Sequence, residues 1–188
     1  MTDHPREFAG RWITAEPFCN LQPRNVYHRQ LDRAAQPPPE PEFENRHILF
    51  RRGFDLQHTA GTVLYITADD CYKLYVNGQF VTQGPAPGYP FHYYYNQIDL
   101  TPYVRPGRNL IAVHTYYQGL INRVWVSGDR RHGLLLDLCQ QDGLVLASDE
   151  SFRCREHSGY SAAGVVGYKT QFLERYDAAA PENGFEDP

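Results

Sequence analysis

The chain has 188 residues, a formal net charge of −4 and a pI near 6.0. This length suits one domain that buries roughly 70% of its unfolded surface, so no disulfide or metal is needed for folding. The mildly acidic charge gives no electrostatic basis for binding nucleic acid or an anionic membrane, and no apolar run approaches the ~20 residues of a membrane span.

The first seven residues, MTDHPRE, contain no apolar stretch of the kind that a secretory signal needs. We therefore expect a cytoplasmic protein, or a secreted one whose leader has been removed. None of the eight histidines lies in a zinc-binding spacing, and we predict no metal and no cofactor. The four cysteines also lack paired metal-ligand spacing, and we expect reduced thiols at Cys19, Cys71, Cys139 and Cys154.

Residues 1–45 are predicted to be irregular and to pack on the domain that follows. Trp12 and Ile13 form a short apolar start. The tract QPPPEPE at residues 36–42 excludes a central strand or a helix interior. Because only ~35 residues precede this tract, we interpret it as an extended surface connection and not as a domain boundary.

From residue 47 onward, short alternating runs of apolar residues are separated by turn residues, and no long segment has a helical period. This pattern predicts an all-β fold, a jelly-roll-like antiparallel β-sandwich that occupies residues 46–178. The expected strands cover residues 47–56, 62–68, 71–76, 79–82, 109–117, 133–138 and 144–147.

The strongest local signal is the segment ADDCYKLYVNGQFV at residues 68–81. Asn77-Gly78 separates two alternating runs, and both residues tolerate the positive φ angles of a type I′ turn. The segment is therefore predicted to be a two-residue β-hairpin. A second hairpin turn is predicted at Gln141-Asp142-Gly143.

One helical turn is predicted within the segment DLTPYVRPG at residues 99–107. Thr101 is the expected N-cap and Pro102 the first helical residue, because proline suits a position whose N–H has no partner within the helix. Pro106-Gly107 is expected to end this turn.

The hairpin segment, followed by Gly84-Pro85, resembles the N-terminal β-sandwich domain of bacterial α-L-rhamnosidases, glycoside hydrolase family 78. Residues 100–113 again resemble this family-78 domain, and they also resemble the sugar-binding jelly-roll domains of β-galactosidase-like enzymes. The family-78 resemblance extends over roughly residues 10–188. It is carried, in the expected order, by further blocks at Trp12-Ile13, FRRGFDL (50–56), GDRRHGLLLDL (128–138) and QFLERYDA (171–178).

The resemblance implies a domain that does not itself hydrolyse the substrate. In this family the catalytic residues are paired carboxylates on an (α/α)6 barrel, which inverts the stereochemistry of the sugar. The barrel of the same parent chain is therefore the implied partner, with rhamnose-containing glycans as a possible second one. Residues 179–188 are expected to begin the linker to that barrel.

The residues themselves also argue against catalysis, and we predict no catalytic residue in this chain. Inverting hydrolysis needs two carboxyl groups ~6.5–9.5 Å apart on opposite sides of the scissile bond. Asp69 and Asp70 are neighbours, so on a strand they should point to opposite faces. We expect them to bind backbone amides at the strand end, as aspartates in turns do. Glu174 and Asp177 could approach one another, but no cleft is implied there.

The best candidate binding site is aromatic. The segment GPAPGYPFHYYY at residues 84–95 predicts a stiff loop that leads into a group of tyrosines. Aromatic rings and polar side chains together suit a sugar, although tyrosines on strands also pack in a core or line a domain interface. The candidate carbohydrate-binding residues are Tyr89, Tyr93, Tyr117, Asn122, Arg123 and Trp125.

Three functions follow from these observations. The first is a non-catalytic accessory domain of an α-L-rhamnosidase-like glycoside hydrolase, which supports the barrel and contacts carbohydrate. The alternative is a free-standing carbohydrate-binding, lectin-like module. The third, an independent glycosidase, lacks the separated carboxylates that the reaction requires.

Overall fold

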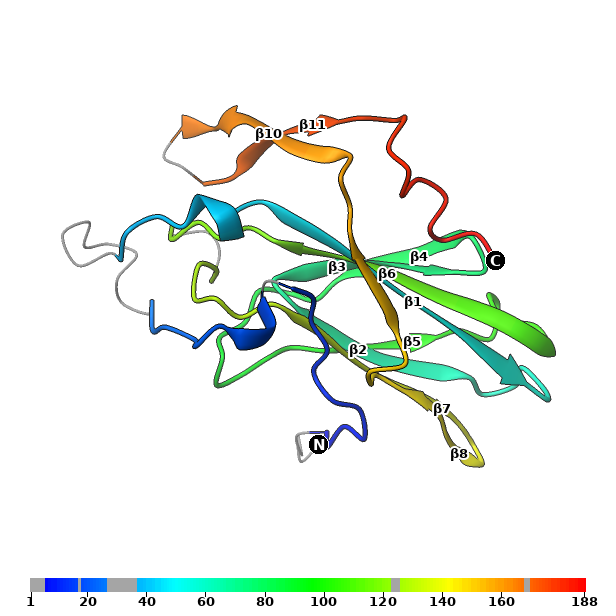
Figure 1. The fold of residues 1–188 in the computed structure, drawn as a ribbon. Coiled ribbons are helices and arrows are strands. Elements are labelled where there is room, and N and C mark those ends of the chain that lie inside the picture. The colour runs from blue at the N-terminus through cyan, green and yellow to red at the C-terminus, as the bar shows by residue number, and fades with distance from the viewer. Residues whose placement is uncertain (1–5, 17, 27–36, 123–125, 168–169) are drawn as a thin grey trace.

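A computed structural model describes residues 6–16, 18–26, 37–122, 126–167 and 170–188. These residues form an antiparallel β-sandwich with a separate two-stranded hairpin (Figure 1). A five-stranded sheet has the order β4-β3-β6-β1-β9, and a four-stranded sheet has the order β5-β2-β7-β8. The strands are β1 (Arg46–Leu56), β2 (Val63–Asp69), β3 (Cys71–Val76), β4 (Gln79–Gly84), β5 (Asn96–Asp99), β6 (Gly107–Tyr117), β7 (Gly133–Gln140), β8 (Gly143–Ala147), β9 (Arg153–Glu156), β10 (Tyr160–Val165) and β11 (Phe172–Tyr176).

The core lies between the two sheets because alternate residues of each strand point inward. On β3, Tyr72, Leu74 and Val76 are buried, whereas Lys73 between them is exposed. The facing sheet contributes Leu64 and Ile66 from β2, with Leu134, Leu136 and Leu138 from β7. Among the described residues, no helix is long and apolar enough to span a membrane. The helical turns η1 (Phe18–Asn20) and η2 (Pro41–Phe43) have three residues each.

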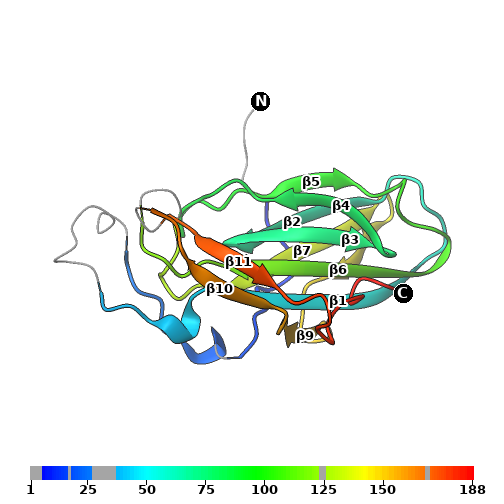
Figure 2. The same ribbon diagram turned by 90° about the horizontal axis from the view of Figure 1, so that it is seen from above.

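The hairpin of β10 and β11 lies over the outer face of the five-stranded sheet, as both ribbon views show (Figures 1 and 2). Beyond the hairpin, residues 179–188, which we expected to begin a linker, run back over the same face. The ring of Phe185 contacts that of Tyr75 on β3, with centroids 5.7 Å apart. The hairpin and this C-terminal segment therefore form a partial third layer.

The N-terminal segment lies beside β7, where Ile13 pairs with Leu134, and is fixed at Asp137. One carboxylate oxygen of Asp137 accepts a hydrogen bond from the N–H of Ala9 and the other from that of Gly10, each at 2.9 Å. The Arg6 guanidinium lies 3.2 Å from the same carboxylate and 3.5 Å from the ring centroid of Tyr65. Asp137 is buried, and these contacts supply the partners that a buried carboxylate needs.

The predicted hairpin at Asn77-Gly78 is confirmed. Both residues have positive φ, 51° and 81°, and Val76 pairs with Gln79 across a two-residue turn. The Asn77 amide also donates to the carbonyl of Tyr103 and accepts from the N–H of Leu110, each at 2.9 Å. This turn thus holds β3 and β4 against the start of β6.

Two expectations of local structure need correction. Residues 101–103 form only a hydrogen-bonded turn, and its cap is Asp99, whose carboxylate accepts the N–H of Thr101 at 2.9 Å. The strands β5, β9, β10 and β11 were not predicted. They have four to six residues each, and β9, with the sequence RCRE, is exposed along its whole length, so alternation gives little signal.

Candidate functional site

The predicted aromatic loop, residues 84–95, follows β4 and has a locally determined shape. Tyr89 and His92 exchange backbone hydrogen bonds of 3.2 and 2.8 Å, which close a tight turn around Pro90 and Phe91. At Gly88, a Cβ atom would lie 2.7 Å from the carbonyl oxygen of His92. Glycine is therefore required at position 88 for the loop to close.

Two rings at the tip of the aromatic loop are exposed together. Tyr89 and Phe91 stack in parallel, with an interplanar angle of 2° and centroids 5.3 Å apart. Their exposed fractions are 37% and 74%. A stacked pair of partly exposed aromatic rings is a surface suited to the C–H face of a sugar.

Tyr93 of the same loop is turned toward the protein. Its hydroxyl donates a 2.6 Å hydrogen bond to a carboxylate oxygen of Asp69, and its ring lies 5.1 Å from that of Trp12. Tyr93 therefore fastens the aromatic loop to the end of β2 and does not extend the exposed stack.

Behind the loop, Asp69, Asp70 and Asp129 are buried. The side chains of Asp69 and Asp70 interact with one another, contrary to our expectation that they point to opposite faces. The reason is that β2 ends at Asp69, so strand alternation does not extend to Asp70. Asp70 accepts the N–H of Gln118 at 2.7 Å, which is the backbone binding that we predicted for these aspartates.

Burial dominates the electrostatics of this pair. Loss of hydration raises the pKa of Asp70 to about 7. The pKa of Asp69 is raised well above its ordinary value, first by burial and then by the charge of Asp70. Two adjacent buried carboxyl groups with raised pKa values do not flank a glycosidic bond, so they do not form the separated pair of an inverting hydrolase.

A cavity of about 430 Å³ separates β11 from the outer face of the five-stranded sheet. It begins at Gly84 and Pro85, where the aromatic loop begins, so the two features are continuous. This volume lies within the range of small-molecule pockets. Its polar lining consists of Asn45, His47, Lys73, Gln83, His114, Tyr116, Gln118, Gln171 and Glu174.

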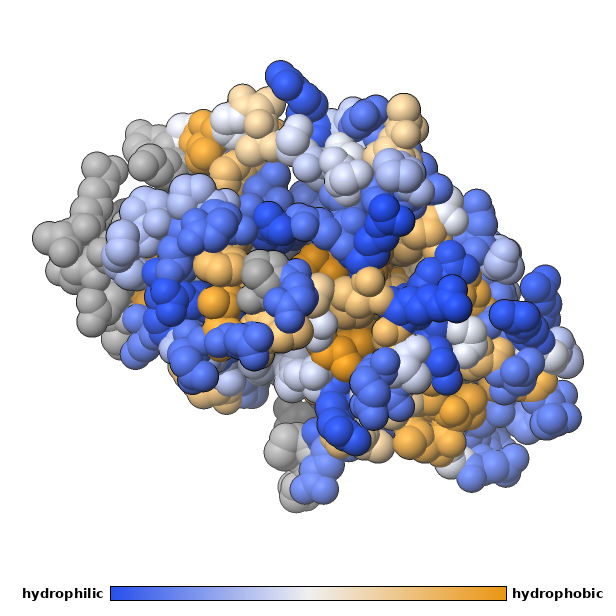
Figure 3. Space-filling view, viewed as in Figure 1, coloured by the Kyte–Doolittle hydropathy of each residue, from blue (hydrophilic) through white to orange (hydrophobic). Residues whose placement is uncertain are grey.

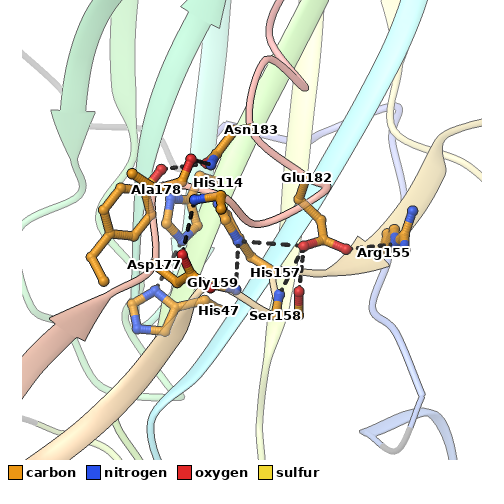
Figure 4. Close-up of polar contacts among 12 residues, drawn as sticks. His47, His114, Arg155, His157, Ser158, Gly159, Asp177, Ala178, Glu182 and Asn183 are labelled. Atoms are coloured by element: carbon orange, nitrogen blue, oxygen red, sulfur yellow. Dashed lines mark hydrogen bonds and ion pairs between the residues drawn. The ribbon is translucent and has the colours of Figure 1, made fainter.

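The histidines of this cavity belong to a buried polar cluster beneath the hairpin (Figure 4). A hydrogen bond of 3.0 Å joins His47 to His114, and the ring of His157 lies 5.8 Å from that of His114. Burial lowers the pKa of all three imidazoles, that of His47 to about 3. Neutral imidazoles are potential metal ligands, but no group of three or more ligating side chains among the described residues is arranged to hold a metal ion.

Glu182 connects this cluster to the C-terminal segment (Figure 4). Its buried carboxylate accepts the hydroxyl of Ser158 at 2.6 Å and lies 3.0 Å from the Arg155 guanidinium. The hydrogen bond with Ser158 lowers the pKa of Glu182, which therefore stays charged at neutral pH. Because Ser158 lies two residues before β10, Glu182 ties the base of the hairpin to the C-terminal segment.

The structure separates the predicted sugar-binding residues. Tyr117 is 1% exposed, within the core, and Asn122 is buried with its amide donating to Gln118 at 2.9 Å. Arg123 and Trp125 lie outside the described residues. The exposed stack thus contains Tyr89 from the predicted set and adds Phe91, which the string of aromatics at residues 89–95 could have indicated.

No family model and no curated protein matches the chain. Solved structures do match it. The family GH78 rhamnosidase of Bacillus sp. GL1 aligns with a TM-score of 0.76 and 26% identity over 98% of this chain and 17% of that one. The α-L-rhamnosidase of Aspergillus terreus aligns with a TM-score of 0.57 and 27% identity over 80% of this chain and 18% of that one.

The α-L-rhamnosidase of Dictyoglumus thermophilum shares the fold, with a TM-score of 0.57 at 22% identity, over 76% of this chain and 16% of that one. This chain therefore spans less than a fifth of the length of each of these enzymes. The resemblance expected from the sequence is confirmed: the chain is built like a domain that family-78 α-L-rhamnosidases contain within a much longer polypeptide.

Proposed function

We propose that this chain is a non-catalytic accessory domain of an α-L-rhamnosidase-like glycoside hydrolase, and that its aromatic loop contacts carbohydrate. The observation that carries the proposal is the match of 98% of this chain to 17% of a family-78 rhamnosidase. The geometry of Asp69 and Asp70 supports the non-catalytic part, because adjacent buried carboxyl groups cannot act on the two sides of one bond.

The proposed main partner is a catalytic (α/α)6 barrel in the same parent chain. An exposed apolar surface supports this partner. Figure 3 shows hydrophobic residues over the end of the β10–β11 hairpin, at the upper left. Val165 and Leu173 on this hairpin are 40% and 47% exposed, and apolar side chains gathered on a surface suit an interface with another domain.

The purified chain is expected to show no hydrolysis of an aryl α-L-rhamnoside, even at high protein concentration. The physical reason is that Asp69 and Asp70 are adjacent and buried, so they cannot act on the two sides of one glycosidic bond. The release of the aryl alcohol measures the reaction. Turnover that co-purifies with the chain and is abolished by Asp70→Asn or Glu174→Gln would show that the chain is itself a glycosidase.

L-Rhamnose and rhamnosylated oligosaccharides are expected to bind weakly at the aromatic loop, with a dissociation constant on the order of millimolar. Two exposed rings held by a closed turn cost little entropy to order, but they bury only a small area. Chemical shifts of backbone amides during a titration measure this binding. Tyr89→Ala and Phe91→Ala should each weaken it severalfold.

The matched control is Phe80→Ala, because Phe80 is an exposed aromatic residue at the other end of β4. This variant should bind as the original chain does. Binding that survives Tyr89→Ala and Phe91→Ala, with shifts confined to Lys73 and Gln118, would move the site to the cavity beneath the hairpin. If no binding is detected in the millimolar range, the proposed carbohydrate contact is wrong, and only the role of supporting the barrel remains.

A further inference from the structure

A second hollow, of about 860 Å³, lies at the far end of β1 and β6. We call it the arginine basin, because Arg51, Arg52, Arg105, Arg108 and Arg153 line it, together with Asp55 and Pro188. The pairing of β4 with β3, and of β3 with β6, places the beginning of the aromatic loop near Thr115 of β6. The basin is lined by Arg108 and Leu110, which lie nearer the start of the same strand. At ~3.3 Å per residue, the two sites are roughly 17 Å apart along the strand.

The strand register explains the shape of the basin. On the outer face, Arg153 of β9 stands opposite Arg51, and Leu110 of β6 stands opposite Gly53. Gly53 has no side chain, and a Cβ atom there would meet only the carbonyl oxygen of Asn109, at 3.7 Å. The floor is therefore open between arginines that stand at its two ends.

Three of the basin arginines donate side-chain hydrogen bonds to backbone carbonyl groups of described residues. Arg51 donates to the carbonyl of Asp187, Arg52 to that of Ser151 and Arg105 to that of Arg108. None of the five basin arginines forms an ion pair with a described residue. In addition, the Nε–H of Arg52 is buried without a hydrogen-bond partner.

This concentration of positive charge is unfavourable in the free protein. Like charges directly opposite one another on paired strands, as at Arg51 and Arg153, destabilise a sheet. Asp55 lines the basin and Asp149 lies close enough to Arg52 for their charges to interact, so two aspartates face five arginines. An anionic ligand would remove the remaining repulsion.

We propose that the arginine basin binds the carboxylate groups of an acidic polysaccharide, one that contains uronic acid residues. Guanidinium groups bind carboxylates through two parallel hydrogen bonds, and arginines at both ends of an open floor suit carboxylates spaced along one chain. Exposed aromatic rings on which bases could stack do not line the basin, which disfavours single-stranded nucleic acid. The choice of a glycan among polyanions rests on the proposed function.

The test is a calorimetric or NMR titration with an oligogalacturonate and, separately, with its methyl ester, which has the same rings without the charge. We expect the charged form alone to bind, and to bind less tightly as the salt concentration approaches about 0.2 M, because exposed charges are screened. Arg108→Gln combined with Arg153→Gln should weaken binding on the order of tenfold. Gly53→Leu should also weaken it, by filling the floor.

The matched control is Arg175→Gln, which removes an exposed arginine of β11 outside the basin. Thermal unfolding checks that each variant remains folded. Equal binding of the methyl ester, full binding by the double variant, tighter binding of a single-stranded oligonucleotide, or no binding of oligogalacturonate at low salt would each overturn the proposal. The rhamnose titration at the aromatic loop is independent of these outcomes, so either site can fail without the other.

Discussion

Replacing Tyr117 with alanine is expected to lower the free energy of unfolding by about 3–5 kcal/mol, which is the usual cost of removing a large buried aromatic side chain. The ring is 1% exposed and lies 5.1 Å from that of Phe18. Its hydroxyl accepts the N–H of Arg130 at 2.8 Å. The variant therefore loses packing and leaves the part-buried N–H of Arg130 without this partner. Denaturant unfolding measures the effect.

Two other variants separate packing from surface exposure. Tyr117→Phe keeps the ring and should cost only about 1–2 kcal/mol, mostly for the lost hydrogen bond. Tyr89→Ala removes an exposed ring and should change stability by no more than about 0.5 kcal/mol. An unfolding midpoint for Tyr117→Ala close to that of the original chain would mean that Tyr117 is not part of the core.

Acidification is expected to destabilise the protein by several kcal/mol between about pH 6.5 and pH 3. His47, His114 and His132 are buried and neutral, and burial lowers the pKa of His47 and of His132 to about 3. In the unfolded chain these groups take up protons near pH 6.5. Their stabilising effect is therefore complete above that pH and is lost as the pH falls toward the lowered folded values.

The surroundings of each histidine fix the sign of this effect. Thr14 and Thr115 each place a hydroxyl 2.8 Å from a ring nitrogen of His132, and neither can neutralise an imidazolium. Lys73 is positively charged, and a proton on His157 would place a second positive charge beside His47, so both lower the pKa of His47 further. Glu182 opposes this effect, because its charge raises the pKa of His157. Together, these surroundings favour the neutral form of the buried imidazole rings.

Melting temperatures from pH 3 to pH 9 measure this dependence. His132→Gln should flatten the acid side of the profile, whereas His58→Gln, which replaces an exposed histidine, should leave it unchanged. Asp70 has the opposite sign: because its folded pKa is raised to about 7, it destabilises the protein as the pH rises above its ordinary value of 3.8. Asp70→Asn should therefore reduce the loss of stability that accompanies a rise in pH from about 4 to about 7. A profile that His132→Gln does not alter would contradict the assignment.

Local patterns in the sequence predicted much of the sandwich. The Asn77-Gly78 turn depends on two adjacent residues, and strand alternation predicted β1 to β4 and β6 to β8 to within a few residues. The same alternation also indicates that Tyr117 is buried, because it is in phase with Ile111 and Val113 on the buried face of its strand. We predicted sugar binding for Tyr117 instead, because aromatic rings suit contact with sugars.

The parts that could not be predicted depend on contacts between distant residues. His47 and His114 are 67 positions apart and meet only through the pairing of β1 with β6. The arginine basin requires the register of three strands, and its open floor depends on one glycine, Gly53, which has no marker in the sequence. The composition gives the number of charged residues, but only the strand register shows that five arginines line one hollow.

The attachment of the N-terminal segment to Asp137 has a consequence for synthesis. Arg6, Ala9 and Gly10 are 127 to 131 positions away from the carboxylate that they bind. A ribosome translating at roughly 5–20 residues per second finishes these residues many seconds before Asp137 exists. During that interval Arg6, Ala9 and Gly10 cannot make these contacts, which form only after β7 has been synthesised.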